Sequence, residues 1–393
     1  MYYHVWAEIN LDALKFNTKQ ILKLVPSKKV IAVVKANAYG HGAGLVAKEL
    51  YSLGVKRFAV SNVYEALDLR FSGLKGEILI FGNTDTNSVL ELVKNDITAC
   101  VYDLDSAKRL NDAAEKENVK LKCHIKLDTG MGRLGFDCRK GSDSTLFEDE
   151  IRQVFSLKNL SIKGAFTHFA TADRDNDLDG EFKSEQYILF EGAKKTVQKV
   201  ASEFKCKKLH FHCSNSAATV FDFENEPSDL YRVGVVLYGL TPNPAVTLPI
   251  SLKPVMTVKA KVTQVKTIKK GDSVSYGKTF TADKNMKIAT ISIGYADGYM
   301  RGLSNCGKML IGEKIAQIVG RVCMDQTMLD VTDIEEVKSG DTVTVFGDGL
   351  PAESVAEALG TINYELVCAV AHRIPRVYIK KGKEVDVIRY RSI

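Results

Sequence analysis

Residues 30–42 read Val-Ile-Ala-Val-Val-Lys-Ala-Asn-Ala-Tyr-Gly-His-Gly. Val30 to Val34 are apolar and mostly β-branched, a run that suits a strand buried on both faces of a parallel sheet. Lys35 stands where this strand ends. Its amine either reaches water along its own stem, or is held in a site with a lowered pKa so that it can attack a carbonyl. The polar and turn-forming residues from Asn37 to Gly42 favour the second interpretation, because loops at strand ends carry function.

Similar apolar runs recur along the first two thirds of the chain. Eight such runs, separated by segments with helical periodicity, match the period and size of a (β/α)₈ barrel. A doubly wound open sheet is the alternative, but no Gly-x-Gly-x-x-Gly follows the first run, which lowers that option. The runs are 30–34, 57–60, 77–81, 98–102, 121–127, 162–167, 208–212 and 233–237. The helical segments include 12–24, 43–52, 62–71, 86–94, 105–117 and 182–204, and residues 6–10 alternate like a short strand.

The pattern changes after Thr241, where four prolines cluster between Pro242 and Pro254. Alternating runs punctuated by glycines follow, which indicates a mostly antiparallel β domain. The runs are 255–265, 287–293, 308–310, 315–319, 328–331 and 342–346, with helices predicted over 353–359 and after Asn363. We therefore predict an α/β chain with an N-terminal (β/α)₈ barrel over residues 1–241 and a C-terminal, mostly antiparallel β domain over residues 242–393.

Composition argues against several classes of partner. The net charge of +6 over 393 residues is mild and no long basic block occurs, so no nucleic-acid surface is predicted. The basic segment 373–383 is interpreted as a solvated face. None of the eight cysteines forms a Cys-x-x-Cys pair, so neither a zinc site nor a disulfide framework is indicated. With no leader-like start and no stretch of membrane-spanning length, the expected location is the reducing cytoplasm.

Polar residues gather where the predicted barrel strands end, which is where active sites form in this fold. Five of the eight runs carry such groups, and this convergence is a stronger signal than any single residue. A phosphate prefers backbone N–H donors, hydroxyls and a helix N-terminus, as Asn215-Ser216 and Gly234 could provide. The polar residues at the ends of these five runs are Lys35, Lys126 to Arg133, Thr167 and His168, His212 to Ser216, and Arg232 to Gly239.

These stretches resemble the motifs of the alanine racemases, in order and along nearly the whole chain. Lys-Ala-Asn-Ala-Tyr-Gly-His-Gly at 35–42 is similar to the family's pyridoxal-phosphate attachment site, where the lysine forms a Schiff base with the cofactor. The other similar stretches are 126–135, 167–173, 212–216, 232–234, 274–277, 293–299, 320–326 and 361–365. Residues 138–148 look like an insertion relative to the family pattern.

The resemblance implies a role for each matching residue. Lys35 and Tyr276 are implied as the two catalytic bases. The implied cofactor-binding residues are Lys35, Tyr39, His168, Ser216, Arg232, Gly234 and Tyr364, and the implied substrate-binding residues are Arg133 and Met324. Supporting residues are Lys126, which is carbamylated in the family and holds the arginine, together with His212, Asp173, Tyr295, Arg301 and Arg321. No metal is implied.

The implied reaction interconverts L-alanine and D-alanine at Cα of the pyridoxal-phosphate aldimine, supplying D-alanine for peptidoglycan. Inversion needs a base on each face, because a single base tends to return the proton to the face it left. An arginine cannot readily protonate the ring nitrogen, so Arg232 there would favour proton return to Cα over transamination. Lys35 belongs to the barrel and Tyr276 to the β domain. The family's head-to-tail homodimer therefore implies an active site shared between subunits.

Three alternatives stay open at this point. A barrel-type amino-acid decarboxylase shares the two-domain plan but differs in its motifs. A non-catalytic pyridoxal-phosphate-binding protein usually lacks the β domain. A broad-specificity or serine racemase is the nearest alternative, since Tyr364 and Tyr276 should crowd the side-chain pocket. One extra methylene changes binding by only about 1–3 kcal/mol, so minor substrates are not excluded.

Overall fold

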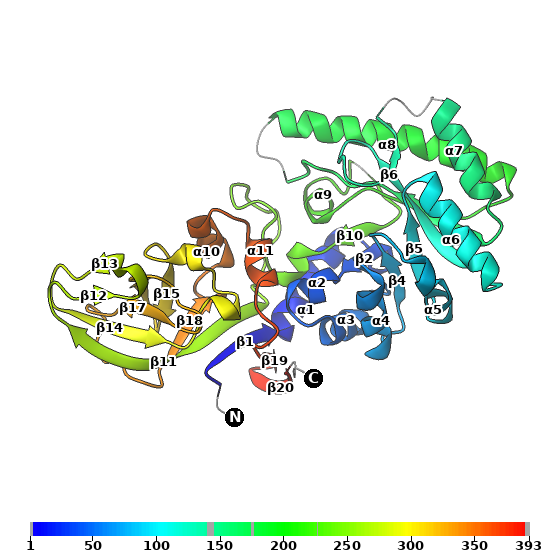
Figure 1. Cartoon of the computed structure of the whole chain (residues 1–393). Coiled ribbons are helices and arrows are strands. Elements are labelled where there is room, and N and C mark those ends of the chain that lie inside the picture. Colours follow the sequence, from blue (N-terminus) through cyan, green and yellow to red (C-terminus); the bar gives the residue numbers. More distant parts are fainter. Residues whose placement is uncertain (1–2, 140–144, 174–176, 226, 390–393) are drawn as a thin grey trace.

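The computed structural model describes residues 3–139, 145–173, 177–225 and 227–389. Two lobes lie side by side, an α/β barrel and a β domain, with both chain ends near their junction (Figure 1). Part of the predicted insertion at 138–148 lies outside the described residues. Within the described residues, no helix combines the length and apolar character needed to cross a membrane.

The barrel is built from eight parallel strands in the order β10, β2, β3, β4, β5, β6, β8, β9. The spatial order follows the chain order, except that β10, the last barrel strand along the chain, pairs with β2, the first. This closing pair confirms the barrel over the doubly wound sheet. Between β9 and β10 the sheet is bridged by single backbone bonds such as Arg232 N–H to Ser214 O, at 3.1 Å. The strands are β2 (Val30–Val33), β3 (Arg57–Val60), β4 (Glu77–Ile80), β5 (Ile97–Val101), β6 (Leu121–Asp128), β8 (Leu160–Phe166), β9 (His210–His212) and β10 (Tyr231–Val233), and the two-residue β7 (Phe136–Asp137) pairs with β6.

The last predicted run, 233–237, is misplaced by about two residues. The strand β10 ends at Val233, and the apolar residues after Gly234 form the 3₁₀ turn η3 (Val235–Tyr238) instead. They are fully buried, and the Tyr238 hydroxyl donates to the carbonyl of Val33 at 2.8 Å. A buried 3₁₀ turn and a buried strand share the same apolar composition, so the pattern alone did not separate them.

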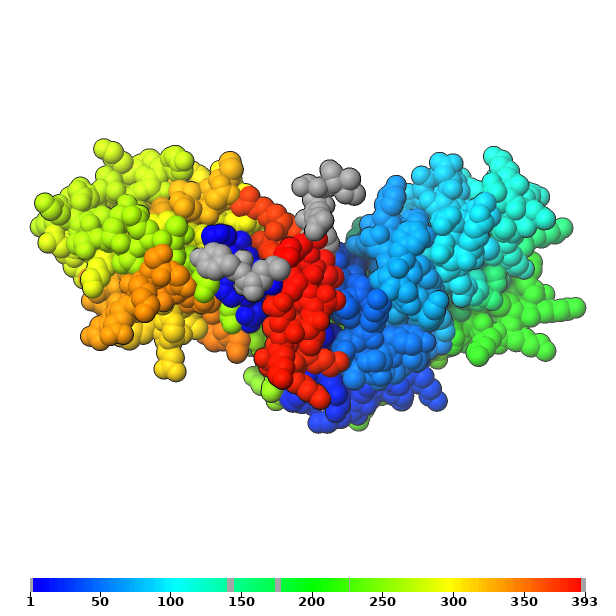
Figure 2. All heavy atoms as spheres, turned by 90° about the horizontal axis from the view of Figure 1, so that it is seen from below, coloured from blue at the N-terminus to red at the C-terminus, as the bar shows by residue number. Residues whose placement is uncertain are grey.

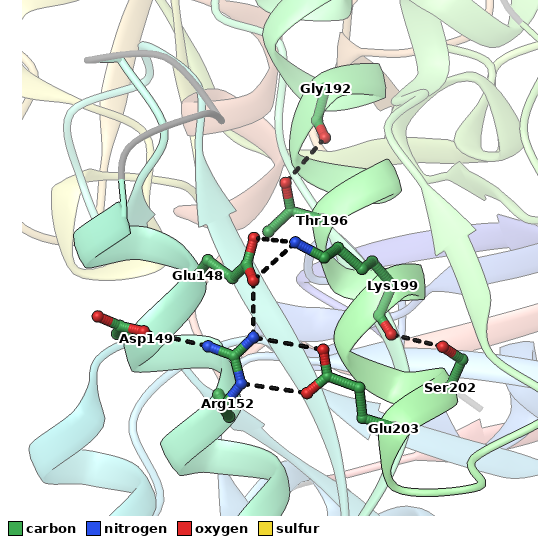
Figure 3. Close-up of polar contacts among 8 residues, drawn as sticks. All are labelled: Glu148, Asp149, Arg152, Gly192, Thr196, Lys199, Ser202 and Glu203. Carbon is green, nitrogen blue, oxygen red and sulfur yellow. Dashed lines mark hydrogen bonds and ion pairs between the residues drawn. The ribbon is translucent and has the colours of Figure 1, made fainter.

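Helices cover the outside of the barrel. Polar caps start several of them: Asn62 accepts from the N–H of Glu65 at the start of α4, and Asp103 forms a capping box with Ser106 on α6. At the far edge, α7 and α8 are joined by an ion-pair network centred on Arg152 (Figure 3). The helices are α1 (Leu11–Leu24), α2 (Lys35–Tyr39), α3 (Ala43–Ser52), α4 (Val63–Phe71), α5 (Val89–Lys94), α6 (Leu104–Lys116), α7 (Thr145–Ser156), α8 (Asp177–Glu203) and α9 (Ser216–Phe221), with short 3₁₀ turns η1 (Ser27–Lys29) and η2 (Thr86–Ser88).

The second lobe is a mostly antiparallel β domain. Strands β14, β17, β16, β15, β18 and β11 close into a ring, because β14 pairs with both β17 and β11. The elements are β11 (Met256–Ile268), β12 (Ser273–Val274), β13 (Phe280–Thr281), β14 (Met286–Ile291), β15 (Lys308–Ile311), β16 (Lys314–Ile318), β17 (Thr327–Asp330), β18 (Thr342–Phe346), β19 (Arg376–Lys380), β20 (Lys383–Ile388), α10 (Ala352–Leu359), α11 (Asn363–Cys368), η4 (Tyr276–Lys278), η5 (Tyr295–Asp297) and η6 (Arg301–Leu303).

The two ends of the chain meet in this β sheet. Strand β1 (Val5–Asn10) pairs antiparallel with β11 and parallel with β19, so the first strand lies outside the barrel sheet. Seen from below, the C-terminal strands in red and the N-terminal strand in blue lie together between the lobes (Figure 2). The division at residue 241 stays a prediction, and the placement of β1 shows that the first residues also build the β domain.

The basic segment 373–383 is not simply a solvated face. Arg376 is 1 % exposed, and its guanidinium donates to four backbone carbonyls, those of Gly40, Val370, Ala371 and Ile374. One residue of β19 thus ties the C-terminal segment to the loop after β2.

Gly42 occupies a position that no larger residue fits. Its φ of +93° is in the left-handed region, and an added Cβ would lie 1.8 Å from the Tyr378 hydroxyl. Gly42→Ala should therefore lower the free energy of unfolding by about 2–4 kcal/mol, combining overpacking with backbone strain. Gly180→Ala is the control, because its Cβ meets open space within α8 and should stabilise by about 0.5–1 kcal/mol. Equal urea midpoints for the two variants would contradict this expectation.

Candidate active site

A cavity of about 500 Å³ opens at the mouth of the barrel, at the carboxyl ends of the strands. This volume is in the range of small-molecule sites. Ten of the residues predicted from the sequence line it: Lys35, Tyr39, Lys126, Arg133, His168, Asp173, Ser216, Arg232, Gly234 and Tyr364. The convergence of polar side chains from several strand ends is therefore present in one place.

Lys35 enters the cavity from an unusual backbone segment. The four residues after it, Ala36 to Tyr39, all have φ between 51° and 55°, so α2 is a single left-handed turn. A non-glycine residue in this conformation costs about 1–2 kcal/mol, and the turn is compensated by hydrogen bonds. They include Ala38 N–H to Val34 O, Gly40 N–H to Ala36 O and Gly42 N–H to Asn37 O, each 2.9 Å long. The lysine is therefore carried by a strained segment that the surrounding structure holds in place.

The environment of Lys35 favours its neutral form. Burial lowers the pKa of the Lys35 amine, the nearby charge of Arg133 lowers it further, and Glu65 opposes both effects. A larger fraction of the amine is then unprotonated near neutral pH, which is the form that can attack a carbonyl or accept a proton.

Arg232 lies buried at the floor of the cavity with its charge retained. Burial lowers the pKa of its guanidinium to about 10, so it stays protonated at neutral pH. Both terminal nitrogens donate to protein acceptors: the carbonyls of Thr167, His212 and Cys213, and His212 Nδ1 at 2.8 Å. His168 Nδ1 lies 3.4 Å from Nη2. These contacts fix the guanidinium plane.

A chain of histidines continues behind Arg232. Because arginine only donates, His212 must accept through Nδ1 and carry its proton on Nε2. That Nε2 lies 3.0 Å from His124 Nδ1, which therefore acts as the acceptor. Burial lowers the pKa of both rings, so both stay neutral. Of the three connected side chains, Arg232, His212 and His124, only Arg232 carries a charge.

Lys126 and Arg133 lie on the strand β6 and the loop that follows it. Burial and the charge of Arg232 lower the pKa of Lys126 to about 8, and its amine donates to the carbonyl of Leu127 at 2.8 Å. The loop that carries Arg133 is held by Asp128, whose Oδ1 accepts from the N–H groups of Gly130 and Gly132 at 3.0 Å each. A buried amine with a lowered pKa therefore faces two arginines.

The opposite wall offers small and hydroxylic groups. The N–H of Gly234 donates to Ser216 Oγ at 2.9 Å, and Ser216 begins α9 behind its cap Asn215. A Cβ at Gly234 would approach the Tyr39 hydroxyl to 2.7 Å, so a larger residue here would force Tyr39 to shift. Burial raises the pKa of Tyr39 and of Tyr364, so both phenols stay protonated and can donate.

Five predicted residues are not brought to this cavity within one chain. Tyr276, on η4 beside β12 and β13, is 72 % exposed, Met324 is 53 % exposed and Tyr295 is 43 % exposed. All belong to the β domain, as do the other two, Arg301 and Arg321. Tyr295 and Met324 nevertheless lie on adjoining loops, because Tyr295 N–H donates to Cys323 O and Ala296 N–H to Met324 O, at 3.0 Å each.

Sequence reasoning missed two residues that contact the site. His124 lies two residues before Lys126 on β6, and the period of two along a strand could have placed both on the same face. Glu65, on the first turn of α4, contacts the backbone after Lys35, and no short-range pattern announces that contact. His212, predicted as a supporting residue on the far side of Arg232, lies behind that arginine, away from the cavity.

Comparison with known proteins points to one family. The family model "Alanine racemase, N-terminal domain" matches residues 9–242, and "Alanine racemase, C-terminal domain" matches residues 255–378. The chain is 43 % identical over 392 residues to the alanine racemase of Clostridium perfringens, covering 98 % of both chains. It resembles the solved alanine racemase of Clostridium difficile 630 with a TM-score of 0.90 at 36 % identity, covering 99 % of each chain. It also resembles the alanine racemase of Bartonella henselae with covalently bound pyridoxal phosphate, with a TM-score of 0.83 at 28 % identity, covering 96 % and 100 %.

Proposed function

The chain belongs to the alanine racemase family, and on that premise we propose that it interconverts L-alanine and D-alanine with pyridoxal phosphate, using Lys35 and Tyr276 as two bases on opposite faces of Cα. The isomerase activity follows from its relatives, whereas the cofactor, the two bases and their arrangement are proposals. The observation that carries them is the convergence of Lys35, Arg232 and Ser216 in one barrel-mouth cavity.

The cavity has the groups that pyridoxal phosphate requires. Lys35 would take the aldehyde, the Ser216 hydroxyl and the Gly234 cradle would take the phosphate, and Arg232 would face the ring nitrogen. Arg232 suits that place because its terminal nitrogens are already committed to protein acceptors among the described residues, which leaves its Nε–H. When bound, pyridoxal phosphate supplies the electron sink that acidifies the Cα–H of an attached amino acid.

Each proposed base needs help to work near neutral pH. Lys35 has it in the burial that lowers the pKa of its amine. A tyrosine ordinarily has a pKa of about 10, so Tyr276 needs a nearby positive charge to stabilise its phenolate. The permanent charge of Arg232, relayed through His168, would provide it once Tyr276 reaches the cavity. Positioned proton-transfer groups typically contribute about 10²–10⁴-fold each.

The exposure of Tyr276 supports a homodimer in which each β domain completes the partner's cavity. Tyr276, Tyr295 and Met324 lie exposed on one chain, outside the cavity that Lys35 lines. Among the described residues, the buried Nε of Arg321 beside Gly277 also has no hydrogen-bond partner, so this part of the β domain is incomplete alone. Head-to-tail pairing would place these side chains over the neighbouring barrel mouth.

The substrate assignment is tested by chiral analysis of the purified enzyme with pyridoxal phosphate and single L-amino acids. We expect rapid formation of D-alanine, slower formation of D-serine and no product from Lys35→Ala. Cofactor colour without any D-amino acid would favour a pyridoxal-phosphate-binding protein, and release of carbon dioxide a decarboxylase. D-serine forming as fast as D-alanine would favour the broad-specificity racemase. A pocket sized for a methyl group distinguishes alanine from serine only weakly.

We propose that Lys126 is carbamylated and that the new negative charge holds Arg133 toward the substrate. With its pKa lowered to about 8, roughly a tenth of the amine is neutral at pH 7, and the neutral amine is the form that adds carbon dioxide. Enzyme equilibrated with ¹³C-bicarbonate should show a carbamate resonance that is missing in Lys126→Ala. That variant should also raise KM for alanine by about 10-fold through loss of the charge. Lys122→Ala, at an exposed position on the same strand, is the control. A wild-type spectrum without the resonance would contradict the proposal.

The physiological role proposed is supply of D-alanine for peptidoglycan from a cytoplasmic enzyme. Support comes from the membership of the chain in the alanine racemase family. A deletion strain that grows normally without added D-alanine, in the absence of a second racemase, would contradict that role.

A further inference from the structure

Glu65 joins two of the loops at the barrel mouth. It lies in the first turn of α4, and each of its carboxylate oxygens accepts one backbone N–H. Oε1 accepts from Ala36 at 2.6 Å, and Oε2 accepts from Ser61 at 2.7 Å. The first donor belongs to the peptide bond that follows Lys35, and the second to the loop after β3. One side chain therefore fixes the start of the left-handed turn to the neighbouring barrel unit.

We propose that Glu65 is a positioning residue for Lys35, whose carboxylate sets the orientation of the peptide between Lys35 and Ala36 and hence the direction in which the amine enters the cavity. Ala36 is the first of the four residues with positive φ, so its N–H marks the start of the left-handed turn that follows β2. The backbone hydrogen bonds from Ala38, Gly40 and Gly42 start further along the turn.

A carboxylate is the group that this place requires. Two N–H donors converge on the side chain, and a carboxylate is an acceptor at both oxygens. Its charge strengthens both bonds and suits the first turn of α4, where the helix dipole is positive. Glutamine has nearly the same shape, but its NH₂ group would face one of the two donors. Aspartate keeps the charge but is one methylene shorter, so it cannot span both loops.

The same carboxylate acts on the amine by its charge. The titratable or charged groups that interact with Lys35 include Glu65, Arg133, Cys368 and His168 among the described residues, and Tyr39, Lys126, Asp173, Arg232 and Tyr364 line the same cavity. Glu65 raises the pKa of Lys35, against burial and Arg133, which lower it. Replacing Glu65 by glutamine removes a negative charge, so the pKa of Lys35 should fall further and its titration should move to lower pH.

The test compares Glu65→Gln with Glu65→Asp, and uses Asp68→Asn as the matched control. Asp68 lies one turn further along α4, and its carboxylate accepts no hydrogen bond from the described residues, so this control removes an equal charge without a backbone contact. The first readout needs no cofactor: acetylation of Lys35 in the cofactor-free protein, followed by peptide mass spectrometry as a function of pH. The second is kcat and KM for alanine in the loaded enzyme.

For Glu65→Gln we expect the acetylation midpoint to move to lower pH and kcat to fall about 10- to 100-fold, the size typical of losing a hydrogen bond to a charged group. KM should change by less than about 3-fold, since the substrate groups are untouched. Glu65→Asp should keep the acetylation midpoint nearer to wild type while kcat still falls. Asp68→Asn should leave kcat unchanged. Glu65→Gln with wild-type kcat and midpoint, or Asp68→Asn with the same losses, would overturn the proposal.

This inference rests on Lys35 being the catalytic lysine, and the two can fail separately. If Lys35→Ala keeps wild-type activity, the proposed function is wrong whatever Glu65 does. If Lys35→Ala is inactive and Glu65→Gln behaves as wild type in both readouts, the role of Glu65 alone is wrong. Thermal unfolding of each variant shows whether a loss of kcat reflects a protein that is still folded.

Discussion

Lys35→Ala is expected to abolish racemisation of alanine, lowering kcat by about 10⁴-fold or more. On the proposed mechanism, the variant would lack both the amine that holds the cofactor and the base on one face of Cα. Among the residues that the structure describes, Lys126 is the one other lysine lining the cavity. Lys126, which also lines the cavity, is bonded to the Leu127 carbonyl and stands beside Arg232. The loss is measured by chiral chromatography of alanine incubated with the purified variant and pyridoxal phosphate.

Two comparisons separate chemistry from misfolding in that experiment. Lys28→Ala changes an exposed lysine just before β2 and should leave kcat unchanged. Added methylamine should restore part of the activity of Lys35→Ala, because a free amine can enter a cavity of about 500 Å³ and accept a proton there. Wild-type turnover by Lys35→Ala would remove the lysine from the mechanism.

Tyr276→Phe is expected to lower kcat by about 10²–10⁴-fold, although Tyr276 is 72 % exposed within one chain. Removing one phenolic oxygen from an exposed turn should otherwise change little, so a large effect requires that the side chain is used elsewhere. Tyr64→Phe, at an 81 % exposed position on α4, is the matched control and should be neutral. A neutral Tyr276→Phe would remove the second base.

Hybrid dimers show where Tyr276 acts. If it completes the partner's cavity, a hybrid of Lys35→Ala and Tyr276→Phe subunits has one site with both residues intact and one site with neither. Random exchange makes half of the dimers hybrid, so about a quarter of wild-type activity should return on mixing two inactive proteins. If both bases came from the same chain, no hybrid site would be intact. No recovery despite demonstrated exchange would therefore contradict action in the partner's site.

The sequence predicted the barrel well because parallel barrel strands are buried on both faces and read as continuous apolar runs. Seven of the eight runs coincide with strands and the eighth overlaps β10 only at Val233, while several helices agree to within a residue or two, such as 43–52 with α3. The last run failed at its boundary because Gly234 ends β10 and the buried 3₁₀ turn after it has the same composition. Local pattern identifies burial more surely than it identifies backbone conformation.

Contacts distant along the chain could not be predicted in this way. Strand β1 pairs with β11 and β19, and the sequence of β1 itself does not predict which strands it pairs with. Arg376 is predicted as part of a solvated basic face, yet it is buried against backbone carbonyls, one of which is that of Gly40 in the Lys35 loop. The left-handed turn from Ala36 to Tyr39 also has no local signal, since three of its residues are ordinarily right-handed.

The candidate site likewise contains residues that local sequence pattern predicts and residues that it does not place. Residues at barrel strand ends were expected in one place and are found together around the cavity. Tyr276, Tyr295 and Met324 were expected there through the family resemblance, and one chain leaves them on the other lobe. In the proposed dimer a second copy of the chain would bring them in, and the pattern of strand ends within one copy does not contain that information.

The most direct test of the two-base proposal is solvent exchange at Cα in deuterium oxide. The Tyr276→Phe enzyme is incubated separately with L-alanine and D-alanine, the loss of the α-proton is followed by NMR, and inversion by chiral chromatography. With Lys35 as the remaining base, we expect one enantiomer to take up deuterium much faster than it inverts, while the other hardly exchanges. Exchange that falls equally for both enantiomers and in step with racemisation would contradict a base on each face.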